Sequence, residues 1–103
     1  MEVITANSNP RIKELNKLNK DAKLRKDRDV FVVEGIRMFR ELPLQNVQEV
    51  YLSESALKEY RDEFKSMGVL DGRNIWILSD GVFAGVSQTK TPQGCMAVVK
   101  CMH

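Results

Sequence analysis

The chain has 103 residues, 43% of them hydrophobic and 29% charged, with a formal net charge of +2 at pH 7. This length holds a single hydrophobic core, so one domain over residues 1–103 is expected. No apolar run approaches the roughly 20 residues of a membrane-spanning helix, and the start lacks a signal peptide, which predicts a cytoplasmic protein with no membrane contact.

The N-terminal segment 9–28 predicts two basic helices. Asn9 suits an N-cap, and Pro10 suits the first helical position. An apolar stripe recurs at three- and four-residue spacing and consists of Ile12, Leu15, Leu18 and Ala22. We expect Asn19 or Asp21 to divide the segment into two helices.

The same segment carries most of the excess positive charge. Residues 9–28 contain eight basic and three acidic side chains, a balance of +5, whereas residues 41–73 contain four basic and seven acidic ones, a balance of −3. This asymmetry indicates a polyanionic partner. Two groups of cations are candidates, the ridge of Lys13, Lys17 and Lys20 and the cluster of Arg25, Lys26 and Arg28. The alternatives are a solvated helix face for the ridge and salt bridges to Asp27 and Asp29 for the cluster.

The next segment predicts a strand, a glycine turn and a short helix. Val30–Val33 is an unbroken apolar run, typical of a strand covered on both faces, which places Phe31 in the core. We expect Gly35 to have a positive φ or a close backbone neighbour. Arg37 follows near a helix N-terminus, where it can bind phosphate or stack on a base. Glu34 would repel phosphate, so it is expected to pair with Arg37 or with a backbone N–H.

Two further strands are predicted at 47–52 and 75–78. The helix between them starts at Ser53 or Ser55 and ends at Gly68. A short helix capped by Ser79 follows the second strand. The side chains expected to be buried in this part of the chain are Leu57, Tyr60, Phe64, Met67, Trp76, Val82, Phe83 and Val86.

A polar loop, Ser87–Gly94, precedes the last strand, Cys95–Val99. None of its eight residues is a large apolar one, so we expect an exposed loop with many hydrogen-bonding groups. Such groups either read base edges and sugar hydroxyls of RNA or satisfy the loop's own backbone. In an extended strand the Cα atoms of Cys95 and Cys101 would lie roughly 20 Å apart, which is too far for a disulfide. The only histidine is His103, and there is no Cys-x-x-Cys, so no metal site is predicted.

The order of elements predicts an α/β fold, a three-layer α/β/α sandwich with a four-stranded sheet. Because each pair of consecutive strands is joined through a helix, the pattern alone favours parallel strands.

Three motifs in register resemble one family. They are Ser8–Lys13 followed by Leu15 and Leu18; Lys23-x-Arg25-Lys26 leading into Phe31-x-x-Glu34-Gly35-x-Arg37; and Thr91–Gly94 before an apolar strand. Over residues 4–100 the chain resembles the N-terminal RNA substrate-binding domain of the SpoU (TrmH) family of RNA 2′-O-ribose methyltransferases. The resemblance implies the fold of the kink-turn-binding ribosomal proteins, in which the sheet is mixed.

The resemblance also implies a function. In that family this domain holds tRNA or rRNA, while a separate C-terminal knotted domain binds S-adenosylmethionine and methylates a ribose 2′-hydroxyl. That domain is absent from the sequence, so we expect neither cofactor nor catalytic residue here. The residues agree, with no nucleophile–base pair, glycine-rich phosphate cradle or metal cluster. The isolated domain is expected to be a monomer and the full-length parent a homodimer.

The expected partner is therefore structured RNA, without metal. The residues predicted to bind it are Asn9, Lys13, Lys17, Arg25, Lys26, Arg28, Gly35, Arg37, Gln88, Thr89, Thr91 and Gln93. Two other interpretations stay open: a free-standing structured-RNA-binding protein of the kink-turn class, and a protein-interaction module that uses the acidic middle segment.

Overall fold

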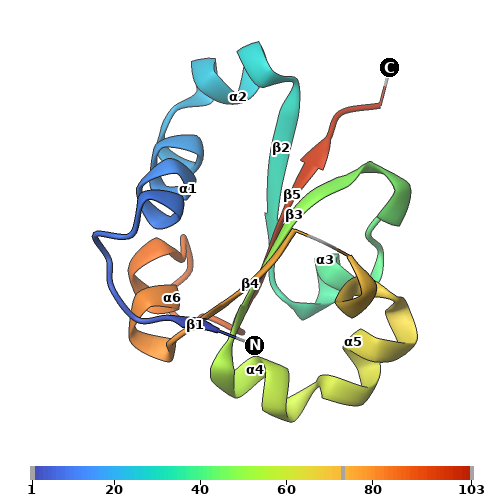
Figure 1. Ribbon diagram of the computed structural model, residues 1–103. Coiled ribbons are helices and arrows are strands. Elements are labelled where there is room, and N and C mark those ends of the chain that lie inside the picture. The colour runs from blue at the N-terminus through green and yellow to red at the C-terminus, as the bar shows by residue number, and fades with distance from the viewer. Residues whose placement is uncertain (1, 73, 103) are drawn as a thin grey trace.

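A mixed five-stranded sheet separates two layers of helices in the computed structural model, which describes residues 2–72 and 74–102 (Figure 1). The strand order is β1-β4-β3-β5-β2. β4 runs parallel to β1 and β3, and β5 runs antiparallel to β3 and β2. The strands are β1 (Val3–Ile4), β2 (Val30–Glu34), β3 (Val47–Ser53), β4 (Ile75–Leu78) and β5 (Cys95–Lys100).

Helices cover both faces of this sheet. On one face lie α1 (Pro10–Lys20), α2 (Ala22–Arg28) and α6 (Asp80–Val86), and on the other lie α3 (Ile36–Arg40), α4 (Glu54–Glu59) and α5 (Arg61–Met67) (Figure 1). Single 3-10 turns occupy Leu44–Asn46 and Val69–Asp71. No helix in the described part of the chain is long and apolar enough to cross a membrane.

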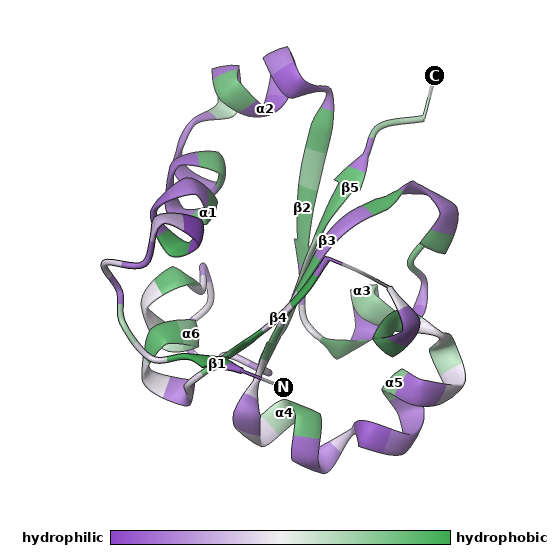
Figure 2. Cartoon of the chain, in the orientation of Figure 1, coloured by the Kyte–Doolittle hydropathy of each residue, from purple (hydrophilic) through white to green (hydrophobic). Residues whose placement is uncertain are grey.

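The core has two halves, one on each face of the sheet. Figure 2 shows hydrophobic strands, with hydrophilic residues mainly on the helices α1, α2, α4 and α5. Phe39 and Phe64 pack edge to face on the α3–α5 side, with ring centroids 5.5 Å apart. On the α1–α6 side the fully buried residues include Ile12, Leu15 and Phe83.

The predicted helix starts are confirmed by their caps. The Asn9 side chain accepts a hydrogen bond from the Arg11 backbone N–H at 2.8 Å. Asp21 divides the basic segment into α1 and α2, and its side chain accepts from Leu24 N at 3.1 Å. Ser53 and Ser79 cap α4 and α6 in the same way.

The α/β sandwich is confirmed, but three details of it differ from the expectations. The sheet has five strands because the two-residue β1 pairs with β4, and a pair of residues is too short for a periodic pattern. It is mixed, as the family resemblance implied, because the loop after α6 returns the chain to the edge where β3 ends. The single helix expected between Ser53 and Gly68 is two helices, α4 and α5, separated at Tyr60.

Two aromatic predictions need correction. Phe31 was expected in the core, yet 40% of its surface is exposed. The reason is that β2 is an edge strand that pairs only with β5, so its face is incompletely covered. Trp76 is half-buried: its ring stacks on Tyr51 at 5.3 Å, and the Arg11 guanidinium covers it at 4.1 Å from the ring centroid.

Candidate RNA interface

The glycine turn and the polar loop, far apart in sequence, form one structural unit that we call the loop edge, residues 34–35 and 87–94. The Glu34 carboxylate accepts hydrogen bonds from the Gln88 backbone N–H at 3.0 Å and from the Ser87 hydroxyl. The Thr89 hydroxyl donates to the same carboxylate at 3.5 Å. Glu34 thus binds a backbone N–H, one of its two predicted partners, and holds the start of the loop against the end of β2.

Gln93 makes the second connection across the loop edge. Its side-chain oxygen accepts a hydrogen bond from Ile36 N at 2.8 Å and so caps α3, a role that Gly35 cannot fill because it has no side chain. Gly35 has φ +102°, and a Cβ there would lie 3.0 Å from the Gln93 side-chain oxygen. Both predicted reasons for a glycine at this position are therefore present, the positive φ and the close approach of a neighbour.

Gly94 fastens the end of the loop to α4. It has φ +87°, and a Cβ at this position would overlap Ser53 and Ala56. The Ser53 backbone N–H donates to the Gly94 carbonyl oxygen at 2.8 Å. Because the loop is fixed at both ends, the orientation of its exposed side chains follows from the fold.

The loop edge offers polar groups around a small cavity of about 220 Å³, lined by Glu34, Gly35, Thr89, Thr91 and Gln93. The side chains of Gln88 and Thr91 are exposed and make no hydrogen bond within residues 2–72 and 74–102. They are therefore available as donors and acceptors for an external ligand.

Arg37 lies on α3, two residues after the glycine turn. It is exposed, and among the residues that the structure describes it has neither an ion pair nor a hydrogen bond. The predicted alternative of a Glu34–Arg37 pair is wrong, since Glu34 binds the loop instead. A free guanidinium beside the loop edge can bind phosphate with two hydrogen bonds or stack on a base.

The cations of α1 and α2 fall into two groups. Arg25 is used internally: one of its guanidinium nitrogens donates to the carbonyl oxygens of Leu18 and Asn19, both at 2.7 Å, which satisfies the C-terminal end of α1. Arg28 pairs with Glu14 at 3.2 Å. Lys17 also lies 4.0 Å from Glu14.

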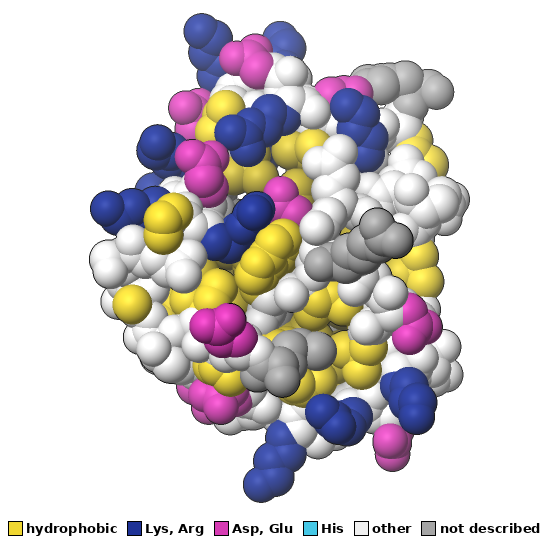
Figure 3. Space-filling model, viewed as in Figure 1, with side chains coloured by type: hydrophobic (Ala, Val, Ile, Leu, Met, Phe, Trp, Pro, Cys, Tyr) yellow, Lys and Arg dark blue, Asp and Glu magenta, His cyan; other side chains and the backbone are white. Residues whose placement is uncertain are grey.

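The second group of cations on α1 and α2 has no internal partner in the described residues. Four exposed lysines of α1 and α2 make no ion pair or hydrogen bond in the described part of the chain: Lys13, Lys20, Lys23 and Lys26. Figure 3 shows basic side chains gathered over these two helices, with acidic ones between them. A shallow groove here is lined by Lys13, Lys17 and Lys20 and by the start of α2. We call α1 and α2 together the basic helices.

The structure brings only part of the basic helices close to the loop edge. α2 precedes the start of β2 and the loop edge lies at the end of that strand, which separates Lys26 from Glu34 by a five-residue strand of roughly 13 Å. The C-terminal turn of α1, however, lies beside the loop, because the Asn19 side-chain amide donates to the Val86 carbonyl oxygen at 3.1 Å. Lys20, at this end of α1, therefore lies next to the loop edge. Asn9, at the other end of α1, does not.

Sequence reasoning missed two contributors to this surface. Ser87 was not singled out, although its hydroxyl anchors the loop on Glu34. Lys90 is an exposed loop cation without an ion pair in the residues described. The position of Lys90 in the middle of the polar loop was the sequence signal that could have identified it as a candidate for RNA binding.

The structure shows no metal centre, because no three His, Cys, Asp or Glu side chains of the described residues gather as ligands. His103, the only histidine, lies outside these residues. Cys95 and Cys101 are free thiols. Burial raises the pKa of the Cys95 thiol from 9.0 to about 12, so this thiol is protonated at neutral pH.

Comparison with known proteins finds a matching family model and solved structures of similar fold. A family model described as the MRM3-like substrate binding domain matches residues 9–97. An rRNA methyltransferase from Sinorhizobium meliloti has a similar structure, with a TM-score of 0.74 and 15% identity over 99% of this chain and 38% of that one. The AdoMet-bound rRNA methyltransferase from the same organism gives the same TM-score and identity, over 99% of this chain and 37% of that one.

A third structure, an RNA 2′-O ribose methyltransferase, has a TM-score of 0.69 and 26% identity over 96% of this chain and 37% of that one. The chain thus spans 37–38% of the length of these enzymes. No match was found among the curated proteins.

Proposed function

Because the chain belongs to the family of MRM3-like substrate-binding domains, we propose that it holds structured RNA, ribosomal or transfer RNA, for a SpoU-type 2′-O-ribose methyltransferase. In this proposal the domain recognises RNA and supplies no catalytic group. The observation that carries the proposal is the loop edge, where two distant segments join around a polar cavity beside free cations. Structured RNA is recognised mainly through phosphates, ribose hydroxyls and unstacked bases, which such groups can bind.

The predicted RNA-binding residues divide into ligands and supports. Gln88, Thr91 and Arg37 have free, exposed polar groups and are assigned to direct contact with RNA. Thr89 and Gln93 hold the loop in shape through Glu34 and Ile36. The support residues give the ligands a fixed geometry before RNA binds, which lowers the entropic cost of binding.

The basic helices add affinity that does not depend on sequence. Lys13, Lys20, Lys23 and Lys26 are free to meet phosphates, and Lys17 has only a weak exposed partner. Each phosphate contact releases bound counterions, so affinity falls as the salt concentration rises. Arg25 and Arg28 are assigned to the support of α1 and α2, because internal acceptors already engage them.

S-adenosylmethionine would be held outside this domain. Glycines that hold a cofactor leave open space beside the backbone, whereas Gln93 fills the space beside Gly35, and Ser53 and Ala56 fill the space beside Gly94. These residues do not fit the cofactor, and no step through it is assigned to them.

The test is a salt titration of RNA binding. We expect the double substitution Lys20→Gln and Lys23→Gln to reduce the slope of log Kd against log salt concentration by about 1.5, since each phosphate contact contributes about 0.7 to 0.9. The matched control is Lys58→Gln with Lys65→Gln, two exposed lysines on α4 and α5. Equal slopes for the wild type and the Lys20/Lys23 variant would contradict the assignment of the basic helices.

A further inference from the structure

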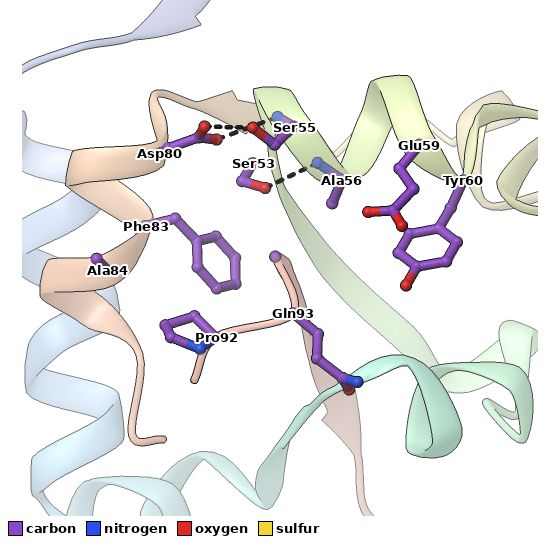
Figure 4. Close-up of a pocket in the computed structure, with 11 residues that line it drawn as sticks. Ser53, Ser55, Ala56, Glu59, Tyr60, Asp80, Phe83, Ala84, Pro92 and Gln93 are labelled. Atoms are coloured by element: carbon purple, nitrogen blue, oxygen red, sulfur yellow. Dashed lines mark hydrogen bonds between the residues drawn. The ribbon is translucent and has the colours of Figure 1, made fainter. Parts of the chain in front are cut away.

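A second, larger cleft lies between α4 and α6 next to the end of the polar loop (Figure 4). Its volume is about 460 Å³, within the range of small-ligand sites. In Figure 4, Phe83 and Pro92 approach the cleft from the α6 side, and Glu59 and Tyr60 approach it from the α4 side. None of these four residues is among those predicted to bind RNA.

The walls of the cleft are fixed relative to one another. The Ser55 backbone N–H donates to the Asp80 carboxylate at 3.0 Å, and the Ser55 hydroxyl donates to its second oxygen, which ties α4 to the start of α6. Gly94 forms part of the lining, where its close packing on Ser53 leaves no room for movement. The cleft therefore exists before any ligand binds.

The chemistry of the lining excludes phosphate and suits a flat, neutral ring. Pro92 and Tyr60 supply apolar and aromatic surface, as in pockets that stack an unpaired base, whereas Phe83 is buried and belongs to the core behind the cleft. The only charged side chains in the lining are the carboxylates Glu59 and Asp80, which repel phosphate. Glu59 makes no hydrogen bond or ion pair within the described residues, so its oxygens are free acceptors.

The cleft is continuous with the loop edge. Gln93 lines both this cleft and the small cavity beside Glu34 and Thr91. An RNA strand whose backbone lies along the loop edge can therefore turn one base into the cleft, without a second binding site for its phosphates.

We propose that this cleft receives one unstacked nucleobase of the RNA and prefers bases with an exocyclic amino group, such as cytosine and adenine, over uracil. The inference rests on the proposed function, because it presupposes RNA at the loop edge. The amino group of such a base donates to Glu59, and its ring lies between Tyr60 and Pro92. Uracil presents a carbonyl oxygen instead, which a carboxylate repels.

The experiment uses three RNA hairpins that are identical except for one bulged nucleotide, C, A or U. We expect wild-type protein to bind the C and A hairpins about tenfold more tightly than the U hairpin, because a carboxylate–amino contact discriminates by about this factor. Glu59→Gln should reduce the preference to less than about twofold, since the amide can also donate to uracil. The control Glu54→Gln removes the same charge from the same helix outside this cleft and should keep the preference.

A second variant blocks the cleft without touching Glu59. Ala84 is exposed on α6 and lines the cleft, so Ala84→Trp should fill it and abolish base preference while leaving the salt dependence of binding unchanged. Ser66→Trp, on the exposed side of α5, is the matched control. Circular dichroism and thermal melting establish that both variants fold.

The outcomes separate the inference from the function on which it rests. Equal wild-type affinity for the three hairpins would overturn the base cleft but leave RNA binding standing. If wild-type protein binds no hairpin, the proposed function fails as well. If an arginine-containing peptide shifts the NMR signals of Ala84 and Gly94 and the hairpins do not, the cleft binds a cationic protein segment and the base assignment is wrong.

Discussion

The loop edge and the basic helices are both polar surfaces, but they use their polar side chains differently. At the loop edge, Glu34 and Gln93 bind groups more than 50 residues away, and few polar groups besides Gln88 and Thr91 remain free. Among the cations of the basic helices in the described residues, only Arg25 donates to backbone carbonyl oxygens, and four lysines make no hydrogen bond or ion pair. The contrast indicates that the loop edge is a rigid surface that recognises the shape of its ligand. The basic helices instead carry mobile lysine side chains that attract negative charge. Substitutions of the loop-edge residues that make internal hydrogen bonds or close contacts should therefore change stability, and those of the lysines should change only salt-dependent affinity.

Among single substitutions at neutral pH, the largest effect is expected at Gly94. Gly94→Ala should reduce the free energy of unfolding by about 3 kcal/mol, because the new Cβ is strained at positive φ and overlaps Ser53 and Ala56. Urea denaturation measures this loss. The control Gly81→Ala lies in α6 with no atom within 4 Å of the new Cβ and should be neutral or slightly stabilising. Similar stability for the two variants would mean that the loop does not pack on α4 as described.

Arg25 tests whether the basic helices contain a structural exception. Arg25→Ala should cost about 2 kcal/mol of folding free energy, since it removes two charge-assisted hydrogen bonds to the end of α1. Its neighbour Lys26 has no partner in the described residues, so Lys26→Ala should leave the unfolding midpoint unchanged. A stability loss of the same size in both variants would remove the distinction between the two residues.

Alkaline pH should weaken the strand behind the loop edge. Burial raises the pKa of Cys95 from 9.0 in an exposed thiol to about 12, so above pH 9 the unfolded chain loses a proton that the folded chain keeps. Stability therefore falls as the pH rises from 9 to 12, by at most about 1.4 kcal/mol per pH unit for this group. Burial and the hydrogen bond to Glu49 also raise the pKa of Tyr51, which acts in the same direction above pH 10.

Cysteine variants isolate the thiol in this pH experiment. Cys95→Ala should flatten the decline in stability between pH 9 and 12, whereas Cys101→Ala, at a half-exposed site, should not. An unchanged slope in Cys95→Ala would show that the alkaline loss comes from other groups.

The smallest of these effects is expected at Gln93. Gln93→Ala leaves the Ile36 N–H at the start of α3 without its acceptor and should cost about 1 kcal/mol. Gln88→Ala, in the same loop, removes a side chain with no internal partner in the described chain and should leave thermal stability as it is. If the Gln88 variant is the less stable one, the assignment of support and ligand residues must be reversed.

Local signals in the sequence predicted much of the fold. The cap residues Asn9, Ser53 and Ser79 act within three residues of their own positions, so short-range rules were sufficient. The family resemblance is confirmed by the match over residues 9–97 and by the solved methyltransferases, and it correctly implied a mixed sheet. Hydrophobic periodicity alone did not predict the mixed sheet, because the direction of β5 depends on the path of the preceding loop.

The features that depend on neighbours in space could not be predicted in this way. Phe31 has the pattern of a core residue, and its exposure follows only from the edge position of β2. Arg25 and Lys26 look equivalent in a basic run, yet the turn at Asp21 directs only Arg25 onto the end of α1. Nor does the sequence show that the loop meets Glu34, because their contact requires β2 and β5 to be neighbours.

The central claim is that RNA contacts the loop edge and the adjoining basic helices, and NMR mapping tests it most directly. A titration of the isotope-labelled chain with a bulged RNA hairpin should shift the backbone signals of residues 88–93, Arg37 and the C-terminal half of α1. The outer face of α5 should serve as the unshifted reference. Shifts confined to α4 and α5, or no shifts at concentrations where the salt titration reports binding, would contradict the proposed interface.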